Sequence, residues 1–249
     1  MKKTRKSPDP GQSENGFLPG LAIDAVIFGF YEKQLRILIL EYRNTGLFAL
    51  PGGFITENED LDAAARRILS ERTGLNNIYL EQFHVFGDRS RHNPSSMRTI
   101  MKKNKIKITP GHWLLKRFVS VGYYALINFK KAVPRPDFMS DRCEWYDLEN
   151  LPSLMQDHQT IVKKALDTLR LNLDRQLIGF NLLPETFTIS DLQSLYETIL
   201  DEKLNRSSFQ RRILGLNILE RVEKKYSGGS HKAPWLYQFR SSSAARLTT

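Results

Sequence analysis

The chain has 249 residues, a formal net charge of +10 and a hydrophobic content of 41%. This length suits one large or two small domains, and the hydrophobic content is sufficient for a core. The single cysteine, Cys143, excludes an internal disulfide, and no apolar run approaches the roughly 18 residues of a membrane span. We therefore expect a cytoplasmic protein with no membrane partner, and the positive charge predicts an anionic partner.

Residues 1–19 are basic and lack the apolar stretch of a signal peptide, so we expect a disordered leader. Runs rich in β-branched and aromatic residues follow at 23–30 and 35–42, on either side of a short polar turn, and predict a β-hairpin. After a Pro-Gly-Gly turn, a helix is predicted from about Leu61 to Gly74, because glycine commonly follows the last helical residue.

The segment at residues 89–117 carries nine lysine or arginine residues and no acidic residue, nearly the whole charge imbalance. We call it the basic insertion, and its polar runs predict a long loop. Loops of this length in a compact domain are usually functional or mobile. Three roles remain open: a solvated loop, contact with a DNA backbone, or contact with a ligand or subunit.

Strands are predicted at 78–86 and 118–129, on either side of the insertion. Apolar residues from His158 to about Arg170 then recur at helical spacing. The first unit, over residues 20–175, therefore combines strands with two helices.

A second unit is predicted over residues 176–240, followed by a flexible tail at 241–249. Apolar residues at 189–200 recur at helical spacing, with Ser190 as the expected N-cap. Asn205 can cap a second, basic helix, for which we expect a buried stripe of Phe209, Ile213, Leu214 and Leu216. Strands at 218–222 and 235–239 complete a winged helix-turn-helix pattern.

The charges of this second unit suit duplex DNA. A recognition helix in the major groove can bind guanine through arginine and adenine through glutamine, while serine and the basic wing reach phosphates. The residues predicted to contact DNA are Asn205, Arg206, Ser207, Ser208, Gln210, Arg211, Arg212, Lys224, Lys225, His231 and Lys232. A helical protein-interaction module with solvated charges is the alternative.

The segment at residues 53–75 resembles the Nudix box, whose pattern is Gly, five residues, Glu, seven residues, then Arg-Glu-aliphatic-x-Glu-Glu-x-Gly-aliphatic. The matching residues are Gly53, Glu59, Arg67, Leu69, Glu71, Gly74 and Leu75. Ile68 and Arg72 stand where the family has two of its three helical glutamates.

Positions 68, 71 and 72 share one face of a helix, where three carboxylates could hold Mg²⁺. This sequence offers one carboxylate, one hydrocarbon and one permanent positive charge, and Glu71 can pair with a nearby arginine. We therefore predict no enzymatic activity, no metal and no cofactor. Glu57 and Glu59 on the preceding loop leave weak residual hydrolysis open.

Together, the two units resemble the Nudix-related transcriptional regulators, over about residues 20–240. The resemblance implies an α+β fold, with a Nudix-like α/β/α sandwich followed by a winged helix-turn-helix domain. The sequence of residues 178–188 resembles that of a branch whose members control sugar-utilisation operons and sense pentoses such as arabinose or xylose. Another branch controls NAD metabolism and responds to ADP-ribose.

The predicted function is thus a dimeric, operator-binding repressor or activator of a sugar-utilisation operon, with a sugar as its effector. Paired half-sites about one DNA turn apart favour a homodimer. An ADP-ribose-responsive regulator of NAD metabolism and a Nudix pyrophosphohydrolase with an appended interaction domain are the alternatives.

A neutral sugar needs carboxylate and amide acceptors with an aromatic platform, whereas a nucleoside diphosphate favours basic residues. The expected effector-binding residues lie near the ends of the central strands. They are Asp24, Glu41, Tyr42, Pro51, Gly52, Phe54 and Tyr123.

Overall fold

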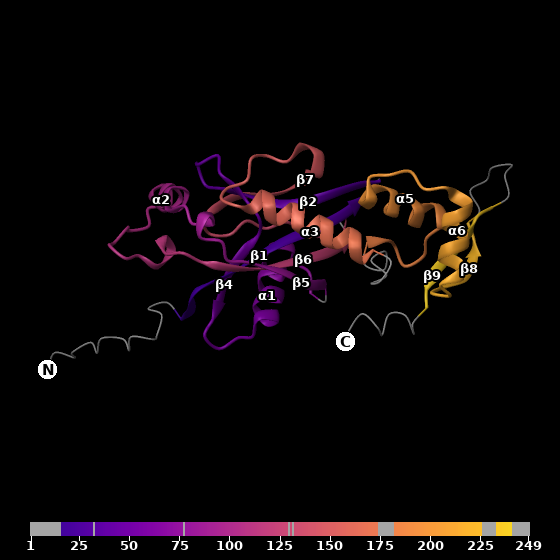
Figure 1. Ribbon diagram of the computed structural model, residues 1–249, viewed down its shortest axis with the longest axis horizontal. Helices are drawn as coiled ribbons and strands as arrows, with labels where there is room; N and C mark the ends of the chain where they lie inside the picture. Colours follow the sequence, from indigo (N-terminus) through magenta and orange to yellow (C-terminus); the bar gives the residue numbers. More distant parts are fainter. Residues whose placement is uncertain are drawn as a thin grey trace.

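The structure is a computed structural model that describes residues 16–31, 33–76, 78–128, 130, 132–173, 182–225 and 233–240. The larger, sheet-containing unit and the smaller helical unit lie at opposite ends of an elongated molecule (Figure 1). The predicted tail and most of the predicted leader lie outside the described residues.

A mixed seven-stranded sheet forms the first unit. Its strands are β1 (Phe17–Tyr31), β2 (Gln34–Tyr42), β3 (Phe48–Ala49), β4 (Gly52–Thr56), β5 (Tyr79–Phe86), β6 (Val119–Asn128) and β7 (Ser140–Asp147). The strand order is β3-β2-β1-β6-β5, β4 pairs with β1, and β7 pairs with β2. β1 and β6 are parallel neighbours, whereas the other pairs are antiparallel.

The first strand begins earlier than the sequence predicted. Phe17 already pairs with Thr56 of β4, so residues 17–19 belong to the sheet and not to a disordered leader. The hydrophobic pattern of residues 23–30 marks only the fully buried part of this strand, because its first residues are intermediate or exposed.

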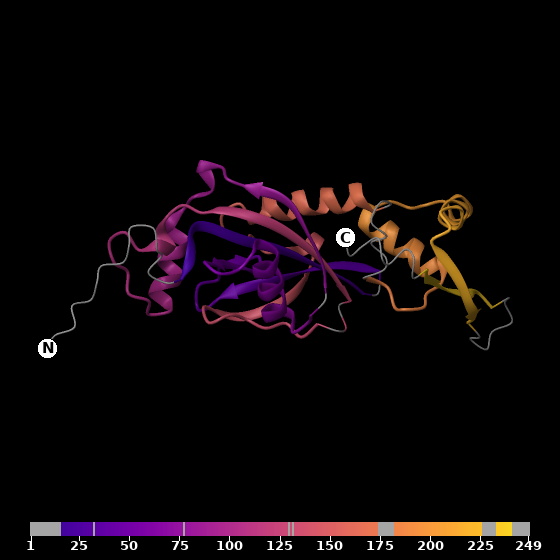
Figure 2. The same cartoon turned by 90° about the horizontal axis from the view of Figure 1, so that it is seen from below.

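Two helices cover the two faces of the sheet: α1 (Leu61–Thr73) and α3 (His158–Asn172). Because neighbouring strand residues point to opposite faces, Val26 and Phe28 pack with α3, whereas Ile23 packs with α1. The two views agree with this arrangement (Figures 1 and 2). The predicted α/β/α sandwich is therefore confirmed.

The basic insertion is not a long loop, as the sequence had suggested. It contains the 3₁₀ turn η1 (Arg89–Arg91), the helix α2 (Pro94–Lys103) and the 3₁₀ turn η2 (Trp113–Leu115). Asn93 caps α2 by accepting a hydrogen bond from the Ser95 backbone N–H at 3.0 Å, and Ile100 and Met101 are buried. A further 3₁₀ turn, η4 (Leu148–Asn150), follows β7.

The second unit has the predicted winged-helix order. It comprises α5 (Ile189–Leu200), α6 (Arg206–Gly215), β8 (Leu219–Lys224) and β9 (Trp235–Phe239), and β8 pairs antiparallel with β9. Phe187 forms an isolated bridge to Tyr237, which attaches the start of the domain to the wing.

Two local predictions in this unit are wrong. Thr188, and not Ser190, caps α5: its hydroxyl accepts from the Asp191 N–H at 3.1 Å, and the Asp191 carboxylate accepts from the Thr188 N–H at 2.9 Å. Leu216 is 46% exposed because it follows the last turn of α6, while Phe209 and Ile213 form the buried stripe.

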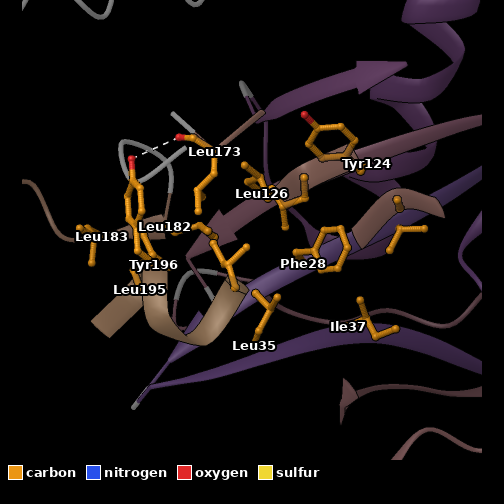
Figure 3. Packing of buried hydrophobic residues seen from close by; sticks show 14 of the residues in the cluster. Phe28, Leu35, Ile37, Tyr124, Leu126, Leu173, Leu182, Leu183, Leu195 and Tyr196 are labelled. Carbon is orange, nitrogen blue, oxygen red and sulfur yellow. Dashed lines mark hydrogen bonds between the residues drawn. The ribbon is translucent and has the colours of Figure 1, made fainter. Parts of the chain in front are cut away.

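A continuous hydrophobic cluster joins the two units. Leu195 and Tyr196 of α5 pack in the same cluster as Phe28 and Leu35 of the sheet (Figure 3). The Tyr196 hydroxyl donates to the Leu173 carbonyl at 3.2 Å, as the dashed line in Figure 3 shows. The end of α3 thus lies directly against the first helix of the second unit.

Among the helices of the described part of the chain, none has the length and apolar character needed to cross a bilayer.

Candidate effector pocket and DNA-binding face

A cavity of about 450 Å³ lies in the first unit, where β1, β4 and α1 meet the basic insertion. The basic insertion contributes seven of its lining residues: Arg91, His92, Asn93, Pro94, Met97, Leu114 and Lys116. This volume falls within the roughly 300 to 1,000 Å³ of ordinary small-molecule sites. Of the roles left open for the insertion, the structure favours a contribution to a ligand site.

Four of the seven expected effector residues line this cavity: Asp24, Tyr42, Gly52 and Phe54. Gly52 allows a close approach of two backbones, because a Cβ there would lie 2.6 Å from the Ile23 carbonyl oxygen. Burial, followed by the nearby carboxylates, raises the pKa of Tyr42 above its ordinary value of 10.0, so its hydroxyl stays protonated.

The other three expected residues do not line the cavity. The Tyr123 hydroxyl donates to an Asp62 carboxylate oxygen at 2.7 Å beneath α1, and Glu41 pairs with Arg142 at 3.8 Å. Pro51 is buried in its turn, where its carbonyl accepts from a backbone N–H. Glu41 and Tyr42 diverge because successive strand residues point to opposite faces.

A buried ion cluster forms one wall of the cavity, and sequence reasoning missed its central residue, Arg91. The Arg91 guanidinium donates to both carboxylate oxygens of Asp157, at 2.8 and 3.0 Å, and to Asp24 at 3.2 Å. Asp24 also accepts from the Ser120 hydroxyl at 2.5 Å. These contacts tie the insertion, β1 and the start of α3 together.

Aromatic side chains form another wall. The ring centroid of Phe54 lies 5.8 Å from Phe17, 4.6 Å from Trp113 and 5.3 Å from Phe118. Phe138 also lines the cavity and is 74% exposed. Such rings can hold the apolar face of a sugar or a base.

The residues of the box form the base of the cavity. Arg67 donates to the Glu59 carboxylate at 2.7 and 3.0 Å and to the Phe54 carbonyl at 2.9 Å, and it pairs with Glu71 at 3.3 Å. The hydrogen bonds from Arg67 are the main reason why the pKa of Glu59 falls to about 2. The Glu59 and Glu71 carboxylates are therefore both paired with Arg67.

The two departures from the box have different surroundings. Ile68 is 1% exposed and packs beneath the turn, since a Cβ at Gly53 would lie 2.9 Å from its Cδ1. The Arg72 side chain is 11% exposed, lines the cavity and pairs with Asp137 at 3.5 Å.

This donor set does not fit Mg²⁺. The ion prefers oxygen ligands, whereas the helix face presents Ile68, Arg72 and a Glu71 already paired with Arg67. Within the described ranges, no cluster of three or more histidine, cysteine, aspartate or glutamate side chains is arranged to hold a metal.

The exposed face of α6 carries the residues predicted to contact DNA. Asn205 caps the helix by accepting from the Ser208 N–H at 3.0 Å. The other predicted side chains of this face are exposed: Arg206, Ser207, Ser208, Gln210, Arg211 and Arg212. The Arg212 guanidinium, however, lies 5.7 Å from the Tyr196 ring centroid, which gives it a packing role as well.

In the wing, Lys224 and Arg221 lie 5.5 and 5.4 Å from the Trp235 ring centroid. Sequence reasoning missed Arg221 and Trp235, although a basic residue and an aromatic on paired strands are a recognisable combination. The backbone N–H of Lys225 donates to the Pro234 carbonyl at 2.8 Å. His231 and Lys232 lie outside the described residues.

A degenerate Nudix box beneath a nucleotide-sized cavity, joined to a winged helix with a basic face, defines the class of Nudix-related DNA-binding regulators. The comparisons agree. The chain belongs to the Nudix family, because the NUDIX domain matches residues 20–168, and residues 179–239 match the NrtR DNA-binding winged helix domain.

Similar proteins cover both units. A relative in Acinetobacter baylyi, the "ADPR responsive transcriptional repressor NtrR", is 31% identical over 228 residues, which cover 89% of this chain and 82% of that protein. The crystal structure of Shewanella oneidensis NrtR complexed with a 27mer DNA superposes with a TM-score of 0.67 at 28% identity. It covers 90% of this chain and 95% of the other.

These findings correct one prediction. The predicted control of a sugar-utilisation operon by a sugar effector is wrong, because a relative that matches over both units is named an ADPR-responsive repressor. The winged-helix, DNA-binding architecture is confirmed.

Proposed function

We propose that this protein is a transcriptional repressor that binds operator DNA as a homodimer and responds to ADP-ribose. The observation that carries the proposal is the 31% identity to an ADPR-responsive repressor, which runs through the sensing and the DNA-binding units alike. A similarity confined to one unit would leave the link between effector and DNA unsupported.

The chemistry of the cavity supports a nucleotide better than a neutral sugar. ADP-ribose combines an aromatic base, two riboses and a diphosphate, and so requires aromatic surfaces together with cations. The cavity offers Phe17, Phe54 and Phe118 for the first requirement and Arg72 and Lys116 for the second. Phe138, exposed at the rim, is positioned to cover a bound base.

The course of α3 supports coupling between the effector and DNA. At its first turn, the His158 ring nitrogen Nδ1 accepts from the Leu50 backbone N–H at 2.9 Å, beside the cavity. Near its end, Arg170 Nε donates to the Ile199 carbonyl of α5 at 2.8 Å. A ligand that favours one position of α3 over another would therefore also favour one position of the winged helix.

The first experiment measures binding of the protein to a labelled duplex from its own upstream region, and to a scrambled duplex, by fluorescence anisotropy. We expect preference for the upstream duplex and its loss when ADP-ribose is added, whereas arabinose and xylose have no effect. Equal binding to both duplexes would refute the DNA-binding regulator. Retention of the complex at saturating ADP-ribose would refute this effector.

We propose further that the protein does not hydrolyse ADP-ribose. The competing function has support, because an "ADP-ribose pyrophosphatase" of Methanocaldococcus jannaschii is 28% identical over 148 residues, 58% of this chain and 72% of that protein. Against it stand the apolar Ile68 and the cationic Arg72 in the box. Release of AMP from ADP-ribose with Mg²⁺, abolished by Glu71→Gln, would establish the hydrolase and overturn our proposal.

A further inference from the structure

Arg72 stands at a position where the box pattern provides a metal-binding carboxylate. The Arg72 side chain is only 11% exposed, yet it lines the cavity. A family metal would sit between such carboxylates and the phosphates of a bound nucleotide. In this chain the same place holds a cation that is covalently part of the protein.

The hydrogen bonding of Arg72 is incomplete. A guanidinium has five N–H donors, and within the described residues the structure gives Arg72 a single long ion pair, from Nη2 to Asp137 Oδ2 at 3.5 Å. Its Nε is buried and has no hydrogen-bond partner among the residues that the structure describes. Buried donors without partners are rare in proteins, so each one requires an explanation.

The other two buried or half-buried arginines of the cavity differ in this respect. Arg67 is held by Glu59, Glu71 and the Phe54 carbonyl. Arg91 is held by four hydrogen bonds to two carboxylates and a carbonyl. Their donors are engaged in holding the fold, whereas Arg72 makes one long ion pair within the described residues.

Asp137 is fixed independently of Arg72. Its Oδ1 accepts from the Met139 N–H at 2.9 Å and from the Ser140 hydroxyl at 2.6 Å. The loss of one 3.5 Å contact would therefore free Arg72 without displacing Asp137. Asp137 provides a resting partner for the guanidinium when no ligand is bound.

We propose that Arg72 replaces the divalent cation as the group that binds the diphosphate of the effector. This inference rests on the proposed function and adds to it the residue that recognises the effector. Guanidinium binds phosphate oxygens through two parallel hydrogen bonds. It neutralises the diphosphate as a metal would, but it does not bind a water and lower its pKa, so the ligand is held without being cleaved.

The experiment is calorimetric titration of the protein with ADP-ribose, in EDTA and in MgCl₂. We expect the same affinity in both buffers. Arg72→Gln should weaken binding by about 10- to 100-fold, as expected for the loss of charge-assisted hydrogen bonds. Arg66→Gln is the matched control, because Arg66 is an exposed arginine of the same helix, and it should leave the affinity unchanged.

The results separate this inference from the proposed function. If ADP-ribose binds in MgCl₂ and not in EDTA, or if Arg72→Gln binds it as tightly as the wild type, the inference is overturned and the proposed effector stands. If the wild type binds ADP-ribose in neither buffer, both fail. Should Arg72→Gln not fold, as judged by its thermal transition, the comparison of buffers on the wild type still decides.

Discussion

Arg91→Met is expected to destabilise the first unit by about 3 to 5 kcal/mol, the usual cost of removing one partner from a buried ion pair. The Arg91 side chain is 6% exposed, and its partners Asp24 and Asp157 are 12% and 20% exposed. Methionine has a similar length and no charge, so it leaves two largely buried carboxylates without their cation. The penalty comes mainly from these carboxylates.

Urea and thermal unfolding measure this effect, and a loss of 3 kcal/mol should lower the Tm by about 6 to 12 °C in a protein of this size. Arg36→Met is the matched control. Its ion pair with Asp147 has partners that are 30% and 40% exposed, and such pairs contribute about 0 to 1 kcal/mol. Equal, small effects of the two substitutions would refute the conclusion that the Arg91 cluster holds the insertion to the sandwich.

Three further outcomes follow from individual contacts. The pKa of Glu59 is lowered from 4.5 to about 2, so its stabilising effect is complete above about pH 4.5 and is lost as the pH falls toward 2; Glu59→Gln should flatten the change of urea midpoint across that window. Thr188→Ala should cost about 1 kcal/mol of unfolding free energy, while the exposed Ser190→Ala should cost little, which thermal denaturation can compare. Arg211→Ala should weaken operator binding by about 1 to 3 kcal/mol in anisotropy titrations, whereas Arg66→Ala on the first unit should not.

The fold was predictable because its signals are local. The box helix ends at Gly74, whose φ of 69° is a left-handed conformation that favours glycine, as its place in the motif indicated. The buried stripe of α6 followed from the spacing of Phe209 and Ile213. The prediction of α5 placed the cap at Ser190, two residues too late, because the reciprocal contacts of Thr188 and Asp191 that form the cap are seen only in the structure.

The cavity was only partly predictable, because its walls come from segments far apart in the sequence. Asp24 and Arg91 meet although 67 residues separate them, and the charge pattern of the insertion gave no sign that one of its arginines would be buried. The nine cations looked alike in sequence. Burial distinguishes Arg91 from exposed neighbours such as Arg89 and Arg98, and burial depends on packing against β1 and α3.

Ile68 and Arg72 lie one turn apart on α1, yet these two departures from the box pattern have different structural consequences. Ile68 is part of the core, where it packs with Ile23 and Val121. A glutamate at this position would therefore be buried among apolar side chains, with neither water nor a metal to solvate its carboxylate. Arg72 stayed at the cavity and kept a positive charge where the family has a cation. This second departure preserves the attraction for phosphate, so a site that no longer fits Mg²⁺ can still recognise the kind of ligand for which the box is suited.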